Sequence, residues 1–112
     1  MTAGSITQIS VNEVAALVAE GAAFIDVREH QETSAGAAPG TIHLPLQSLA
    51  VDQVPTGVPL VFICRSGRRS DSVASALAGM GYTTYNVVGG MQSWEAAGLP
   101  VIAENGAPGM VL

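Results

Sequence analysis

The sequence contains no lysine, and its permanently charged cations are four arginines. Charged residues make up 12% of the chain, about half of the ~25% found in an average soluble domain. The formal net charge is -5. Nonspecific binding to nucleic acid or to anionic lipid requires a broad basic surface, so this composition excludes both kinds of partner.

Long apolar segments are also missing. No part of the sequence reaches the ~20 consecutive apolar residues of a transmembrane helix. The opening residues, MTAGSITQISVNEV, have neither the basic nor the apolar region of a secretory signal, and we therefore expect a cytoplasmic protein. The length of 112 residues suits one domain with one core. We expect this domain over residues 1–103 and a flexible tail over 104–112, where glycine and proline are frequent.

Cysteine occurs once, as Cys64, so no disulfide can form within the chain. The two histidines, His30 and His43, do not have the spacing of metal ligands. We expect neither a metal nor an organic cofactor. A lone cysteine is either a buried apolar side chain or a reactive thiol, and composition leaves both interpretations open.

Apolar periodicity predicts alternating strands and helices. Helices are predicted from Ser10 to Gly21, over 70–80 and over 91–97, with one helical turn in 45–50, and strands over 23–27, 42–44, 59–63 and 83–88. The segment 28–41 is predicted to be a loop with at most one helical turn. This alternation favours an α/β fold with a mainly parallel central sheet. Ligands bind beyond the carboxyl ends of such strands, and Cys64 follows one of them directly.

The segment PLVFICRSGRRSDSVASAL places Cys64 in a loop between a buried strand and a helix. Such a loop turns its backbone N–H groups inward and forms a nest for anions, to which the helix dipole adds positive potential. Three of the four arginines, Arg65, Arg68 and Arg69, lie in the same stretch, and Gly67 allows a turn that a side chain disfavours. Surroundings of this kind lower a cysteine pKa from about 8.5 to roughly 3.5–7.5, which predicts a thiolate nucleophile.

Two anion chemistries suit this loop, phosphoryl transfer and sulfur transfer. A cysteine phosphatase needs an arginine six positions after the cysteine, where it grips the phosphate with two hydrogen bonds. That position is Ser70, and Arg69 comes one residue earlier. Sulfur transfer is therefore favoured. A small phosphatase or arsenate reductase remains an alternative, and so does an inert buried cysteine beside solvated arginines.

Five sequence blocks, spread in order over residues 6–101, resemble the rhodanese family. The blocks are ISVNEVAALVAEG, FIDVRE, GAAPGTIHLPL, CRSGRRS and VVGGMQSWEAAGLPV. The chain departs from the family pattern at Ala37 and Ala38, where His and Ile are usual, and at Thr33, where an aromatic residue is common. These changes remove apolar bulk near the expected site.

The resemblance implies a rhodanese-like α/β fold with a five-stranded, mainly parallel sheet flanked by helices on both faces. It implies that Cys64 carries sulfur as a persulfide, and that the loop binds the substrate through Arg65, Ser66, Gly67, Arg68, Arg69 and Ser70. The implied activity is that of a thiosulfate sulfurtransferase without a cofactor. Since the chain has no second cysteine, the acceptor would be an external thiol or cyanide. A non-enzymatic sulfur carrier or binding module with the same fold is the competing interpretation.

The other residues of interest are assigned structural roles. Asp26 ends a buried strand and needs a partner, which Arg28 can supply. Ser70 is predicted to cap the following helix, with contact to the persulfide as the alternative. Packing roles are expected for Trp94 and His43, a surface position for His30, and a favourable position at the helix dipole for Asp71.

Overall fold

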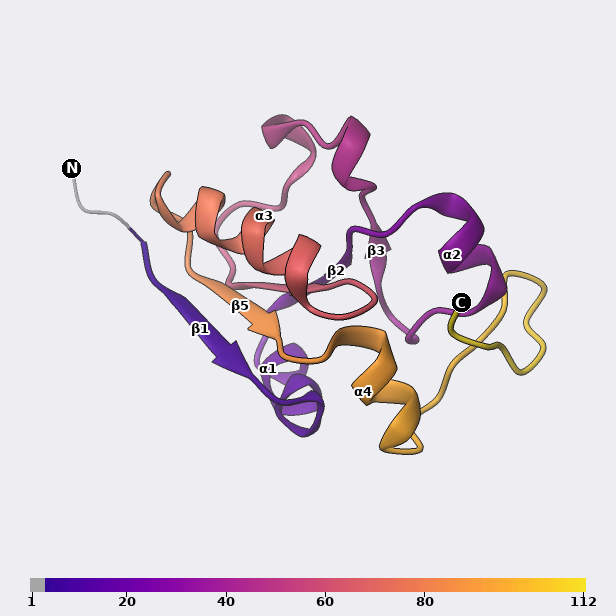
Figure 1. Ribbon diagram of the computed structural model, residues 1–112. Coiled ribbons are helices and arrows are strands. Elements are labelled where there is room, and N and C mark those ends of the chain that lie inside the picture. The colour runs from indigo at the N-terminus through magenta and orange to yellow at the C-terminus, as the bar shows by residue number, and fades with distance from the viewer. Residues whose placement is uncertain (1–3) are drawn as a thin grey trace.

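The computed structural model describes residues 4–112 (Figure 1). The strands are β1 (Ile6–Ile9), β2 (Ala23–Asp26), β3 (Ile42–His43), β4 (Leu60–Ile63) and β5 (Thr84–Val87). The α-helices are α1 (Val14–Ala19), α2 (His30–Ala35), α3 (Arg68–Ala78) and α4 (Gly90–Ala96). Short 3-10 helices are η1 (Val11–Glu13), η2 (Leu46–Ser48) and η3 (Val51–Gln53).

The five strands form one sheet in the order β1-β5-β4-β2-β3, and every pair of neighbours is parallel. Helices α1 and α4 lie on one face and α3 on the other (Figure 1). The predicted fold class is therefore confirmed. Because all strands run the same way, their carboxyl ends share one edge of the sheet, and the segments that follow them meet there.

Each face of the sheet has its own apolar core. Trp94 of α4 packs with Phe24 of β2 in the first core, with ring centroids 5.7 Å apart. Phe62 of β4 lies in the second core beneath Val73 and Leu77 of α3. The strand β4 is buried along its whole length, so its continuous run of apolar residues reflects two covered faces. The packing role expected for Trp94 is confirmed.

Several element boundaries differ from the sequence prediction. The first helix begins with the 3-10 turn η1, and the Ser10 backbone N–H donates to the Glu13 carboxylate as the capping pattern predicts. The strand β1 was implied only by the family resemblance, because its residues ITQI have no apolar run of the kind that marks β4. The turn η2 lies within the predicted helical turn over 45–50, and the third 3-10 helix, η3, was not predicted.

The start of α3 was also predicted wrongly. The helix begins at Arg68 instead of at residue 70, since Gly67 adopts a left-handed φ of 96° and its carbonyl accepts the helical hydrogen bond from Asp71 N–H. Ser70 therefore lies inside the first turn and is not the cap. Its hydroxyl faces Cys64 instead, in line with the alternative role.

The C-terminal segment 104–112 forms defined contacts with the domain. Met110 N–H donates to the Ala35 carbonyl at 3.0 Å, and Val111 N–H donates to the Glu95 carboxylate at 3.2 Å. These contacts lay the segment between α2 and α4, and its flexibility remains a prediction. No helix within residues 4–112 is long and apolar enough to cross a membrane.

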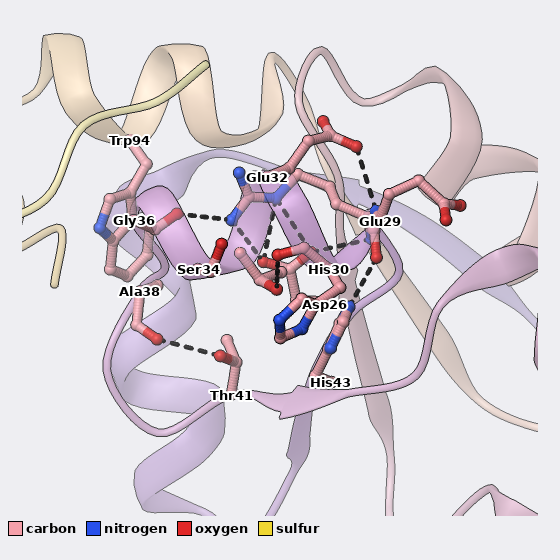
Figure 2. Close-up of polar contacts among 12 residues, drawn as sticks. Asp26, Glu29, His30, Glu32, Ser34, Gly36, Ala38, Thr41, His43 and Trp94 are labelled. Carbon is pink, nitrogen blue, oxygen red and sulfur yellow. Dashed lines mark hydrogen bonds and ion pairs between the residues drawn. The ribbon is translucent and has the colours of Figure 1, made fainter. Parts of the chain in front are cut away.

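A buried ion pair ties the end of β2 to the segment after α2. Asp26 and Arg28 both have fully buried side chains, and their closest charged atoms are 2.8 Å apart. The Arg28 guanidinium also donates to the Gly36 carbonyl at 2.8 Å, so Gly36 and the Asp26 carboxylate face one cation (Figure 2). His43 Nε2 donates to the Arg28 carbonyl. The predicted structural pairing is confirmed, and it fixes the path of the chain beside the carboxyl edge of the sheet.

We predict that Asp26→Asn destabilises the fold by roughly 3–5 kcal/mol, because it leaves the Arg28 charge buried and uncompensated. A loss of this size is a large part of the 5–15 kcal/mol typical of a domain. Urea unfolding measures it. The exposed Asp52→Asn variant is the control and should change the free energy of unfolding by no more than about 0.5 kcal/mol. An equal effect of the two variants would contradict the structural role of the pair.

Candidate active site

Cys64 is the first residue after β4, at the carboxyl edge of the sheet and between the ends of β2 and β5. Its side chain is fully buried, in a loop that closes at Gly67 before α3 begins. The predicted strand, loop and helix are therefore present in that order. The helix that starts after the loop has 11 residues, which is long enough for its dipole to act on the loop.

Hydrogen-bond donors surround the Cys64 sulfur. Gly67 N–H donates to Sγ at 3.1 Å, and the Ser70 hydroxyl oxygen lies 3.3 Å from Sγ. Backbone N–H groups of Ser66 and Ser70 also act on the sulfur. The loop thus has the inward-facing amides that a sulfur anion requires.

Two opposing effects set the acidity of Cys64. Burial raises the pKa of the thiol, because it disfavours the charged form. The hydrogen bonds from the Ser70 hydroxyl and from the N–H groups of Ser70, Gly67 and Ser66 outweigh burial, so the pKa of Cys64 is lowered from its ordinary value. The Arg69 guanidinium adds a coulombic attraction. The thiolate is therefore favoured mainly by hydrogen bonds.

Close packing against the start of α4 fixes the loop. Met91 N–H donates to the Cys64 carbonyl at 2.7 Å, and Gln92 N–H donates to the Arg65 carbonyl at 3.0 Å. Gly90 has a φ of 54°, and a β-carbon built there would lie 2.3 Å from the Cys64 carbonyl oxygen. Only glycine allows this approach. Sequence analysis predicted only the helix over 91–97 that follows these glycines, although two adjacent glycines after a strand are also a signal of close backbone contact.

The three loop arginines have different surroundings. Arg69 forms two hydrogen bonds of 2.8 Å with the Glu32 carboxylate of α2. This pairing lowers the pKa of Glu32 and raises that of Arg69. An anion that binds Arg69 must therefore share the guanidinium with Glu32. Arg65 donates from Nε to the Leu112 carbonyl at 2.6 Å, at the surface.

Of the three loop arginines, Arg68 is the one whose side chain has no partner among the described residues. Its exposed side chain has no hydrogen bond or ion pair to any residue within 4–112. It lines a polar pocket of about 480 Å³ beside the loop, together with Gln8, Ser66, Gly67, Asp71, Ser72, Asn86, Val88 and Gly89. This pocket places the Arg68 side chain beside Ser66 and Gly67 of the loop and beside Asp71 of the same helix.

Sequence analysis missed Asn86 of β5. Its side chain is buried, and its Oδ1 accepts the Ser70 hydroxyl at 2.6 Å. A polar residue in the buried strand YNVV was the available signal, because a buried amide requires partners. The remaining predicted positions are as expected: His30 is exposed, and Asp71 lies in the first turn of α3. Within residues 4–112, no three His, Cys, Asp or Glu side chains are grouped so that they could hold a metal ion.

Several known proteins resemble this chain in sequence. The sequence model of the rhodanese-like domain matches residues 10–97. The putative sulfurtransferase YtwF of Bacillus subtilis is 38% identical over 79 residues, which cover 69% of this chain and 77% of that protein. The thiosulfate sulfurtransferase GlpE of Pseudomonas entomophila is 34% identical over 92 residues, which cover 80% of this chain and 84% of that protein.

Solved structures share the fold. A rhodanese-related protein from Thermoplasma volcanium superimposes with a TM-score of 0.80 at 27% identity, over 88% of this chain and 99% of that one. A rhodanese-like domain protein from Staphylococcus aureus gives a TM-score of 0.71 at 26% identity, over 79% of this chain and 90% of that one. Matched along most of its length in both sequence and structure, this chain belongs to the rhodanese-like domain family.

Proposed function

We propose that this protein is a thiosulfate sulfurtransferase that carries sulfur as a persulfide on Cys64. The observation that carries the proposal is the convergence of the Gly67 N–H and the Ser70 hydroxyl on the Cys64 sulfur, which lowers the pKa of the thiol. The names of the relatives support it, since GlpE is a thiosulfate sulfurtransferase. No cofactor takes part in the proposed reaction.

The proposed reaction has two steps. In the first, the Cys64 thiolate attacks the outer sulfur of thiosulfate. A bond forms between the two sulfurs, the sulfur–sulfur bond of thiosulfate breaks, and sulfite leaves with the bonding electron pair. In the second step, an acceptor thiolate or cyanide attacks the outer sulfur of the persulfide, and Cys64 leaves as the thiolate.

The loop residues have distinct proposed roles. The backbone N–H groups from Arg65 to Ser70 hold the negative outer sulfur, as a nest holds an anion. Arg68 attracts the doubly charged donor, because its guanidinium has no partner in the described part of the chain. Arg69 contributes more weakly, since its Nη1 and Nη2 groups already donate to the Glu32 carboxylate.

The acceptor is external in this proposal, because the chain has one cysteine and cannot pass the sulfur to another of its own. A thiol of a small molecule or of a protein would serve. The free Cys64 thiol requires a reducing environment to stay available, which is the reason for proposing a cytoplasmic location.

The phosphatase alternative is disfavoured by the same contacts. The sixth position after Cys64 holds Ser70, whose hydroxyl lies 3.3 Å from the sulfur. A phosphate-gripping arginine is thus replaced by a short neutral side chain. Arg69 is engaged with Glu32 on α2.

Thiosulfate treatment should add one sulfur atom to the protein, and cyanide should remove it. Intact-mass measurement checks both changes. The Cys64→Ser variant lacks the nucleophile and should gain nothing. If the unmodified protein also gains no sulfur, the proposed function is wrong.

The Ser70→Ala variant should raise the pKa of Cys64, because it removes one hydrogen bond that favours the thiolate. The thiolate is lost as the pH falls through its pKa, so the variant should lose activity at a higher pH than the unmodified protein. At alkaline pH, where both are ionised, the variant should react at least as fast as the unmodified protein, because a thiolate of higher pKa is the stronger nucleophile. The pH profile of sulfur transfer measures this shift, and an unchanged or acid-shifted profile would contradict the role of Ser70.

The Arg68→Ala variant should raise KM for thiosulfate about tenfold. A hydrogen bond to a charged group contributes roughly 1.5–3 kcal/mol, and the lower value applies here because the Arg68 side chain is exposed. The value of kcat should change little, because Arg68 binds the donor and does not touch the transferred sulfur. Added salt should narrow the difference between the two proteins. A fall in kcat with KM unchanged would remove Arg68 from donor binding.

A further inference from the structure

Two polar side chains of β5 are buried against α3. Thr84 donates its hydroxyl to the Ala74 carbonyl at 2.9 Å, and Asn86 contacts Ser70. The two residues are separated by one position, so they face the same side of the sheet. The hydroxyl of Thr84 is thus bonded to a backbone carbonyl of α3, away from the sulfur. Asn86, 3% exposed, is instead bonded to a residue that touches the Cys64 sulfur.

The orientation of the Asn86 amide is determined by its neighbours. Its Nδ2 donates to the Gly67 carbonyl at 3.2 Å and to Gln8 Oε1 at 2.8 Å. A carbonyl can only accept, so the amide nitrogen must face Gly67. Gln8 is oriented in turn, because its Nε2 donates to the Asp71 carboxylate. The remaining atom, Asn86 Oδ1, must therefore face Ser70.

This arrangement sets up a competition for a single proton. The Ser70 hydroxyl has one hydrogen and two possible acceptors. These acceptors are Asn86 Oδ1 at 2.6 Å and the Cys64 sulfur at 3.3 Å. The shorter distance lies on the amide side. The more the hydroxyl donates to Asn86, the less it stabilises the Cys64 thiolate.

We propose that Asn86 is a positioning residue for sulfur transfer, which draws the Ser70 proton away from Cys64 and so keeps the thiolate from being overstabilised. A thiolate loses intrinsic nucleophilicity as its pKa falls, by about threefold for each pKa unit. The backbone N–H groups stabilise the Cys64 thiolate, and Asn86 limits how much the Ser70 hydroxyl adds to this stabilisation. The inference rests on the proposed function for its biological meaning, but its test measures Cys64 directly.

Other charged groups near the thiol stay constant in this test. Arg69 of α3 attracts the thiolate, and Glu32 of α2 partly neutralises Arg69. Asp26 and Arg28, at the end of β2, are paired with each other. The Asp71 carboxylate is linked to Asn86 through Gln8, and the Asp71 backbone N–H shares the Gly67 carbonyl with Asn86. Replacing Asn86 with an apolar residue leaves the contacts of Arg69, Glu32, Asp26 and Arg28 in place.

The test is to measure the pKa of Cys64 in the Asn86→Leu variant. The ultraviolet absorbance of the thiolate, recorded as a function of pH, gives this pKa. Since Cys64 is the one cysteine, the signal belongs to a single group. We expect the pKa to fall below that of the unmodified protein, because the Ser70 proton then goes to the sulfur. The limiting alkaline rate of reaction with a small alkylating reagent should fall by about threefold for each unit.

A double-mutant cycle separates this effect from damage to the loop. In the Ser70→Ala background, which has no hydroxyl proton to redirect, Asn86→Leu should leave the pKa unchanged. Thr84→Val is the matched control, because it removes a buried hydrogen bond from the same face of the same strand. It should lower the stability and leave the pKa of Cys64 as it was.

A rise of the pKa in Asn86→Leu, or an equal shift in the Ser70→Ala background, would overturn the proposal. Should Asn86→Leu not fold, Asn86→Val replaces it with a residue suited to strands. NMR of the unmodified protein needs no variant at all: the Ser70 hydroxyl proton should exchange slowly and show a cross-peak to the Asn86 side chain, and its absence would also overturn the proposal. Failure to gain sulfur from thiosulfate would reject the proposed function and leave this result standing.

Discussion

The structure around Cys64 depends on how closely two backbone segments approach each other. The Cys64 and Arg65 carbonyls accept hydrogen bonds from the start of α4, and a side chain on Gly90 would overlap them. Because this contact anchors the loop at its first two residues, the chain can turn at Gly67 and direct an N–H group back to the sulfur. The chemistry of the site thus begins with backbone packing, and the side-chain charges act on a geometry that is already set.

Within this geometry, neutral hydrogen-bond donors contact the sulfur, whereas the charged side chains lie around the loop. The donors that face the sulfur come from Ser66, Gly67 and Ser70, and they act against the cost of burying a charge. The guanidinium groups lie farther out, where Arg69 is held by Glu32 and Arg68 lines a polar pocket. In the proposed reaction, the anionic donor meets the exposed Arg68 before it reaches the backbone amides.

The buried ion pair of Asp26 and Arg28 supports the site from the neighbouring strand. It links the end of β2 to Gly36 and, through the Arg28 carbonyl, to His43 of the short strand β3. These segments lie beside α2, which supplies Glu32 to Arg69. The ion pair has no direct contact with the sulfur. It nevertheless helps to position the Glu32 carboxylate, which partly neutralises the charge of Arg69 in the loop.

Three features could be predicted from the sequence alone: the alternation of strands and helices, the position of Cys64 after a buried strand, and the concentration of arginines beside it. Those features depend on local periodicity and on neighbours in the chain, which can be read directly along the sequence. Three others are visible only in the folded chain: α3 begins at Arg68, Glu32 pairs with Arg69, and Asn86 bonds to Ser70. Each of these depends on residues that are distant in sequence, or on one glycine turn whose φ angle is set by packing, and no local pattern encodes them.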